Sequence, residues 1–222
     1  MSVVFPGDQL STGGSKPSAV GGQDLGDEGI LNTGRRYVPK VGDLVVGVVV
    51  GKTSEFFRVD IKAMSHAVLP TIAFNGATKR NRPNLQNGAV VYCRVTEAHK
   101  DLDTKLTCES PETNKGWSTN EVYLCHLTTG GEDPASEYSG CNCVVDVSLA
   151  HARALLSESA VLFDLLGKSI PYEITIGQNG RIWLQAGSAR EVVMLRLSLL
   201  TSAKLSVVEQ EVMIENLIHE FA

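Results

Sequence analysis

Five short β-type runs between residues 43 and 110 constrain the fold of this chain more than any other feature. Each run contains β-branched or aromatic residues, and Gly, Asp or Pro turns separate it from the next. The runs are DLVVGVVVG (43–51), EFFRVDI (55–61), HAVLP (66–70), AVVYCRVTEA (89–98) and TKLTCES (104–110). Five short strands with one longer link, residues 71–88, predict an OB-type β-barrel.

The pattern after residue 142 predicts a second domain, of the α+β class. It reads strand, helix, helix, strand, strand and helix, followed by a last helix. Ser148 is placed to cap the first helix. The last two helices begin at capping boxes, formed by Ser188 with Glu191 and by Ser206 with Glu209. The order β-α-α-β-β-α is that of a KH domain, so we expect a KH-like fold here.

The rest of the chain reads as connecting sequence. Residues 7–36 are rich in Gly, Ser, Thr and Asp, which is typical of a loop or an extended arm. We therefore expect a multidomain β and α+β protein with four parts: an N-terminal β domain or arm (1–40), the five-stranded barrel (41–109), a linker or insertion (110–141) and the KH-like domain (142–222).

A Gly-x-x-Gly sequence, GQNG at 177–180, raises the question of a nucleic-acid clamp. KH domains clamp a nucleic-acid backbone with such a loop between their first two helices. Here that junction reads LLSESAV (155–161) and has no glycine, whereas GQNG lies between two strands. We predict that Gly177, Asn179 and Gly180 form a hairpin turn, because Asn and Gly tolerate the positive φ that such turns demand.

Charge and composition narrow the possible functions. The net charge of −5 argues against nucleic-acid binding, but residues 41–109 hold nine basic and seven acidic residues, so the barrel is the electrostatic favourite for RNA. Residues 110–222 hold seven basic and fourteen acidic residues, which suits protein partners better.

No run of about 18 apolar residues is present, so we expect no membrane contact. Five cysteines form no even framework, which favours a reduced intracellular compartment.

Three motifs together resemble one family. RRYVPKVGDLVVG (35–47), GATKRNRPN (76–84) and GQNGRIWL (177–184) are similar to the S1–KH cap subunits of the eukaryotic RNA exosome, and among them to exosome component three. The opening VVFPGDQL (3–10) also looks like that family's start. The resemblance covers most of 35–109 and 144–222, whereas residues 110–140 look longer than usual.

The resemblance implies an N-terminal β domain, an S1 barrel and a KH domain without catalysis and without a cofactor. It implies RNase-PH-like ring subunits and other cap subunits as protein partners, and single-stranded RNA as the ligand guided into the central channel for 3′-to-5′ processing and degradation. Nucleus, nucleolus and cytoplasm are the expected compartments. The alternative is a free-standing S1-type RNA binder acting in translation or RNA folding, which would lack stable partners.

The loop GATKRNRPN is the first candidate RNA site. Lys79, Arg80 and Arg82 form the densest basic cluster of the chain, and each cation can neutralise a phosphate. Asn81 and Asn84 could add hydrogen bonds to the sugar or backbone. Contact with a ring subunit is the competing interpretation of this loop, and the sequence leaves both open.

The second candidate is the start of the second strand run, where S1 barrels often expose a stacking aromatic side chain. Phe56 and Phe57 are adjacent, so they face opposite ways, and at most one can be a platform for a base. The nearby cations that we include in the site are Lys52, Arg58 and, across the sheet, Arg94.

Catalytic and metal chemistry find little support in the sequence. His66, His99 and Asp101 have no nucleophile, metal pair or phosphate cradle near them in sequence, so we expect loop residues and no enzyme. Cys141-x-Cys143 is too short for the usual zinc knuckle, and Cys125-His126 alone is insufficient, so we expect no metal.

Overall fold

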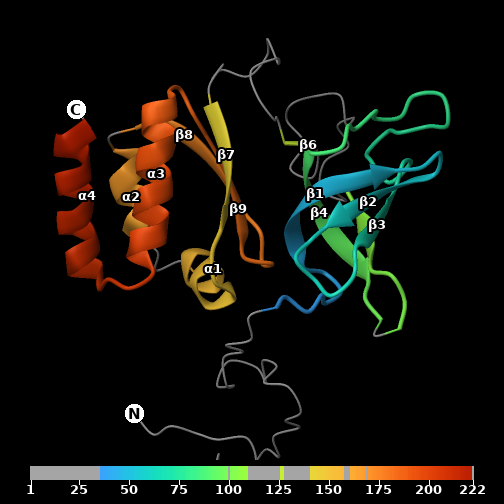
Figure 1. Cartoon of the computed structure of the whole chain (residues 1–222), viewed down its shortest axis with the longest axis horizontal. Helices are drawn as coiled ribbons and strands as arrows, with labels where there is room; N and C mark the ends of the chain where they lie inside the picture. The colour runs from blue at the N-terminus through green and yellow to red at the C-terminus, as the bar shows by residue number, and fades with distance from the viewer. Residues whose placement is uncertain are drawn as a thin grey trace, which may run out of the picture. The chain divides into compact units, whose positions relative to one another are not determined.

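The structure is a computed structural model that describes residues 36–99, 101–109, 126–127, 141–157, 161–168 and 170–221. Most of the predicted N-terminal arm (1–40) and most of the predicted linker (110–141) lie outside these residues. Two folded regions are described, a β-barrel and an α+β region (Figure 1). None of the helices formed by the described residues has the length and apolar character that a bilayer crossing requires.

The predicted five-stranded barrel is confirmed. β1 pairs antiparallel with both β2 and β4, β2 pairs with β3, and β3 runs parallel to β5, which pairs with β4. This pattern closes the sheet on itself, as in OB-type barrels. The strands are β1 (Leu44–Lys52), β2 (Phe56–Asp60), β3 (Ala67–Pro70), β4 (Val90–Glu97) and β5 (Lys105–Thr107), and a short β6 (His126–Leu127) adds to the start of β4.

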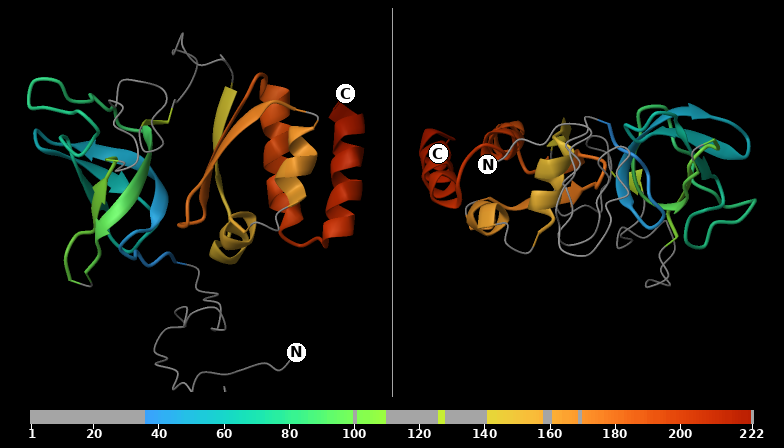
Figure 2. Two further views of the ribbon diagram at one scale, coloured as in Figure 1. Left: turned by 180° about the vertical axis from the view of Figure 1, so that it is seen from behind. Right: turned by 90° about the horizontal axis from the view of Figure 1, so that it is seen from below.

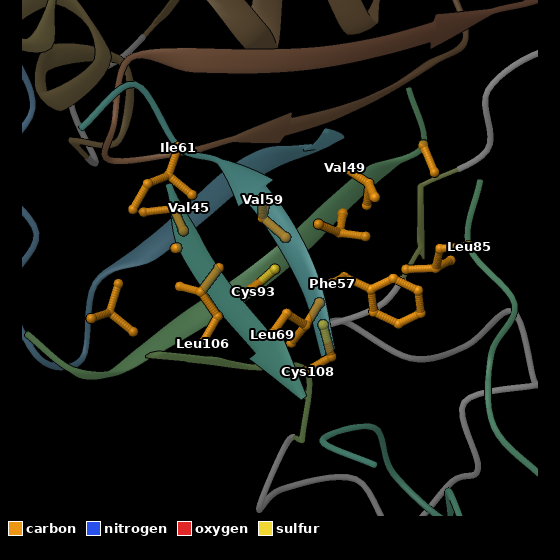
Figure 3. Close-up of a cluster of buried hydrophobic side chains, with 14 of the residues drawn as sticks. Val45, Val49, Phe57, Val59, Ile61, Leu69, Leu85, Cys93, Leu106 and Cys108 are labelled. Atoms are coloured by element: carbon orange, nitrogen blue, oxygen red, sulfur yellow. The ribbon is translucent and has the colours of Figure 1, made fainter. Parts of the chain in front are cut away.

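Alternation of residue type along the strands builds the barrel core. Successive side chains of a strand point to opposite faces, so every second residue enters the barrel. Figure 3 shows the resulting cluster, and its members that are at most 1% exposed are Val45, Val49, Phe57, Val59, Ile61, Ala67, Leu69, Val91, Cys93, Val95, Leu106 and Cys108. Burying each of the larger side chains contributes roughly 1.5–3 kcal/mol.

The long link between β3 and β4 is tied to the same core. Phe74 is 2% exposed and Leu85 is 5% exposed, and both belong to the barrel cluster. The Cys108 backbone N–H donates to the carbonyl of Ala73 at 2.8 Å. The link is therefore held at both ends, and the basic residues between them are displayed on an anchored loop.

The KH-like α+β region is also confirmed. An antiparallel sheet in the order β7-β9-β8 has α2 and α3 against one face, and α4 packs on the far side of those two helices (Figures 1 and 2). Ser188 and Glu191 form the predicted capping box. The elements are β7 (Cys141–Asp146), α1 (Leu149–Leu155), α2 (Val161–Gly167), β8 (Tyr172–Ile176), β9 (Arg181–Ala186), α3 (Ala189–Ser202) and α4 (Val207–Phe221).

Candidate nucleic-acid interface

The tight turn between β1 and β2 positions the predicted aromatic pair. The Thr53 backbone N–H donates to the Phe56 carbonyl at 2.9 Å, and the Phe56 N–H donates to Thr53 Oγ1 at 3.1 Å. Phe57 is fully buried in the barrel, whereas Phe56 is half-buried and lies opposite Pro70 of β3. Of the two phenylalanines, only Phe56 has a surface on which a base could stack.

The link 71–88 contacts this end of β1 and the turn through two hydrogen bonds. Arg82 Nη1 donates to the Ser54 carbonyl at 2.7 Å, and Lys52 Nζ donates to the Asn84 side-chain oxygen. The Lys52 ammonium also lies 5.9 Å from the centre of the Phe57 ring, where a cation–π attraction acts. These contacts join the loop to the β1–β2 turn.

The tip of the loop displays its cations. The Thr78 N–H donates to the Asn81 carbonyl at 2.8 Å, and the Asn81 N–H donates to Thr78 Oγ1 at 3.1 Å, so the turn is closed by its own polar groups. Lys79 and Arg80, between these two residues, are exposed. We call the exposed cations at this end of the barrel the basic rim, consisting of Lys52, Lys79, Arg80 and Arg82.

The remaining predicted cations differ in their relation to the basic rim. Arg58 is exposed on β2, two residues from Phe56, and lies opposite Gly51 of β1. Arg94 pairs with Leu44, at the other end of β1 from Lys52. Eight residues of strand separate those two positions, on the order of 25 Å. The structure therefore groups Arg58 with the rim and does not bring Arg94 to it.

The GQNG hairpin lies against the barrel. Asn179 is fully buried, and its amide donates to the carbonyls of Val46 at 2.8 Å and Ile61 at 3.0 Å. Its side-chain oxygen accepts from the Val46 N–H at 3.3 Å. Gln178 adds two bonds to Leu44, one from its backbone N–H at 2.9 Å and one to its side-chain oxygen at 3.0 Å. The hairpin is thus the joint between the two domains.

The predicted hairpin turn has two glycines, and a side chain is excluded at each of them for a different reason. Gly180 has φ +74, and a Cβ there would lie 2.7 Å from the Val147 carbonyl oxygen. Gly177 has no such φ, but a Cβ there would lie 2.6 Å from the Val46 nitrogen. The prediction for Asn179 needs correction: its φ is not positive, and its conspicuous contribution is the set of side-chain bonds to the barrel.

A charged cluster continues the joint beside the hairpin. Arg181, 7% exposed, donates from Nη1 to the Asp60 carbonyl at 2.8 Å and pairs through Nη2 with the Asp60 carboxylate at 3.0 Å. Its Nε lies 3.3 Å from Asp146, which also pairs with Lys62 at 3.3 Å. Each domain contributes one cation and one carboxylate, so the pairs cross the joint in both directions.

An apolar contact completes the joint. Trp183 of β9 is 4% exposed and clusters with Val46 and Val90 of the barrel, with Tyr92 and Val144 packed around them. Trp183 therefore lies on the face of the KH sheet opposite the helices. Its Nε1 is buried without a hydrogen-bond partner among the described residues, so the side chain acts as an apolar group.

The Asp60 carboxyl makes the joint sensitive to acid. Burial raises the pKa of Asp60, but hydrogen bonds from the Lys62 backbone and the Arg181 side chain outweigh it, so the pKa lies below its ordinary value. A carboxyl with a lowered folded-state pKa stabilises the fold above its unfolded pKa, about 3.9, and loses that contribution as the pH falls through the folded value.

We therefore expect Asp60→Asn to lower the free energy of unfolding at neutral pH and to converge with the wild type in acid. Urea unfolding between about pH 7 and about pH 2 would measure the difference, which should narrow only below about pH 4. Asp101→Asn, in an exposed loop, serves as the control. A gap between Asp60→Asn and the wild type that stays constant across this range would contradict the role given to the ionised carboxylate.

Sequence reasoning noticed the GQNGRIWL motif but missed the joint, because a local motif does not show what it packs against. Gln178 was read only as part of the turn, and neither Arg181 nor Asp60 was predicted as a contact partner. His66, His99 and Asp101 lie in loops, as expected. Cys141 is exposed and Cys143 half-buried, and the described residues hold no metal-ligating group of three; Cys125 lies outside them.

Comparison with known proteins agrees with this architecture. The model for the S1 domain of exosome complex component RRP40 matches residues 37–118, and a KH-domain model matches residues 143–190. Exosome complex component rrp40 of Schizosaccharomyces pombe is 32% identical over 72% of this chain and 60% of its own length. The Drosophila melanogaster exosome complex component RRP40 is 36% identical over 82% of this chain and 70% of its own length.

A solved structure shows the same fold. The crystal structure of a protein described as an exosome complex RNA-binding protein superimposes with a TM-score of 0.62, covering 84% of this chain and 97% of that one, at 20% identity. Fold and joint define a two-domain protein in which an S1-type barrel is fixed to a KH domain through a Gly-x-Asn-Gly hairpin. The chain belongs to the exosome complex component RRP40 family. It spans 60% of the S. pombe relative's length.

Proposed function

We propose that this protein is a non-catalytic RNA-binding cap subunit of the RNA exosome, which helps to guide single-stranded RNA into the central channel and stabilises the ring. The observation that carries the RNA-binding part is the basic rim on the barrel of an RRP40-family chain. The link and the last residue of β1 hold four exposed cations beside a half-exposed Phe56. Cations that neutralise phosphates, with an aromatic platform for a base, are what single-stranded RNA binding needs.

The protein partners that we propose are the RNase-PH-like ring subunits and the other cap subunits. The names of the relatives, components of an exosome complex, support membership of such an assembly. On the same ground we propose the nucleus, the nucleolus and the cytoplasm as its compartments. Co-purification from source cells separates this proposal from a free-standing S1-type RNA binder, because only the cap subunit would recover RNase-PH-like proteins.

The salt dependence of RNA binding tests the basic rim. Each cation that meets a phosphate contributes close to 0.7 to the slope of log affinity against log salt on single strands. Changing Lys79, Arg80 and Arg82 together to alanine should therefore lower the slope of the assembled complex by about two units. Affinity should fall for all sequences alike, and the complex should still assemble.

A matched control removes the same charge elsewhere. Arg36, Lys40 and Lys168 are exposed cations outside the rim, the first two before the start of β1 and the third directly after α2. Their triple alanine variant should keep the wild-type slope. An unchanged slope in the Lys79, Arg80 and Arg82 variant would refute phosphate contact by the rim, and failure of that variant to co-purify with the ring would favour the protein-docking interpretation of the loop.

We also propose that the chain alone does not cleave RNA. Within the described residues, His, Cys, Asp and Glu side chains form no cluster that could hold a metal ion for phosphodiester hydrolysis. The purified protein should leave labelled RNA intact with Mg²⁺, Mn²⁺ or Zn²⁺. Cleavage activity that follows the protein through successive chromatography steps would refute this.

A further inference from the structure

The helix α3 has a second apolar face that is partly exposed in the described part of the chain. Its buried face consists of Val192, Met194, Leu195, Ser198, Leu199 and Ser202. On the other side, Val193 is 48% exposed, Leu197 40% and Leu200 41%. At 100° per residue these three side chains fall within one narrow stripe of the helix. We call this stripe the α3 outer face.

Cations surround the α3 outer face. Arg190, Arg196 and Lys204 are exposed, and they lie before, beside and after the three apolar residues. The only acidic residue of α3 is Glu191, and its carboxylate accepts from the Ser188 N–H in the capping box. The outer face is thus basic in a chain whose net charge is −5.

We propose that the α3 outer face is a docking site for an acidic amphipathic helix of a partner protein. The apolar residues are spaced by four and three positions, and side chains at this spacing pack between those of a second helix. A partner helix with an apolar stripe bordered by Glu or Asp would bury the stripe and pair with the surrounding cations. This proposal does not depend on RNA binding by the basic rim.

The chemistry of the stripe favours this occupant over others. An RNA-binding surface would be expected to offer aromatic side chains for base stacking, whereas Val193, Leu197 and Leu200 are aliphatic. A second copy of the chain would bring the same three cations against one another across a two-fold axis, where like charges repel. An acidic helix satisfies both the apolar stripe and the cations.

The test uses the whole chain and two synthetic helical peptides of about 20 residues. One peptide carries Leu at the heptad a and d positions and Glu at e and g, and the other replaces each Glu by Lys. Fluorescence anisotropy at low salt should show the acidic peptide binding at least about tenfold more tightly than the basic one. Leu197→Asp should weaken binding of the acidic peptide about tenfold, whereas the matched control Val208→Asp, on exposed α4, should not change it.

Charge exchange makes the test specific. The triple variant Arg190→Glu, Arg196→Glu and Lys204→Glu should bind the basic peptide more tightly than the acidic one. This variant leaves the apolar stripe intact, so it still tests the proposal if Leu197→Asp does not fold. Equal affinity for both peptides, or none for either, would overturn the proposal. Three other results would overturn it as well. The wild type could be a dimer that Leu197→Asp dissociates, or the protein could bind anionic phospholipid vesicles and not the acidic peptide. The charge-exchange variant could also lose RNA affinity while the basic-rim variant binds RNA normally.

Discussion

Asn179→Asp is expected to destabilise the protein by roughly 3 kcal/mol or more at neutral pH. The substitution keeps the size and shape of the side chain but removes the amide that donates to the carbonyls of Val46 and Ile61. Each buried polar group left without a partner costs about 1–3 kcal/mol, and the new carboxylate would face two carbonyl oxygens in a fully buried site. The joint between the domains should therefore open before either domain unfolds.

Gln178→Ala is the matched control, because it removes a neighbouring amide whose bond to Leu44 is exposed and leaves the backbone bond in place. It should cost about 1 kcal/mol or less. Urea unfolding measures both variants. Burial raises the pKa of the introduced carboxyl, so the loss of stability in Asn179→Asp should become smaller as the pH falls from about 7 to about 5. This range lies above the one in which Asp60 titrates. A variant as stable as Gln178→Ala at neutral pH would contradict the joint role of Asn179.

Trp183→Ala is expected to cost about 3–5 kcal/mol, the usual range for removing a large buried aromatic side chain. Trp183 packs with Val46 and Val90 of the barrel, so the cavity would open at the joint itself. A lower melting temperature and faster proteolysis between the domains are the expected observations.

Trp183→Phe separates packing from hydrogen bonding. Because Nε1 has no partner among the described residues, phenylalanine should restore most of the lost stability. A Trp183→Phe variant as unstable as Trp183→Ala would show that the indole N–H makes a bond that matters. Val212→Ala, on the exposed side of α4, should stay within about 0.5 kcal/mol of the wild type.

The joint covers the face of the KH sheet that the helices leave open. The sheet face opposite the helices is occupied by the barrel through Trp183 and Arg181, and the Gly-x-Asn-Gly turn is buried against β1. The α1–α2 junction, where KH domains normally hold nucleic acid, has no glycine. We therefore propose a positioning role for the α+β domain, with the basic rim of the barrel as the RNA surface.

The sequence by itself determined the architecture. Five β-type runs separated by turns specified the barrel, and the order of strand-like and helix-like segments specified the KH-like region, because these local patterns are set by residues close together in the chain. The Ser188–Glu191 capping box and the hairpin at 177–180 were predictable for the same reason. The cationic loop was visible as composition, although its anchoring by Phe74 and Leu85 was not.

Only the tertiary structure decided what the turn is for and which residues share a surface. Asn179 bonds to Val46 across 133 positions, and Arg181 reaches Asp60 across 121 positions. The choice of Phe57 over Phe56 for the core follows from the register of β2 against β1 and β3, and the separation of Arg94 from Lys52 follows from its pairing with Leu44. The contacts of Asn179 and Arg181 depend on how two independently patterned domains fit together, and the placement of Phe57 and Arg94 depends on strand pairing within the barrel. Local pattern carries no information about either, because periodicity and capping reach only a few residues along the chain.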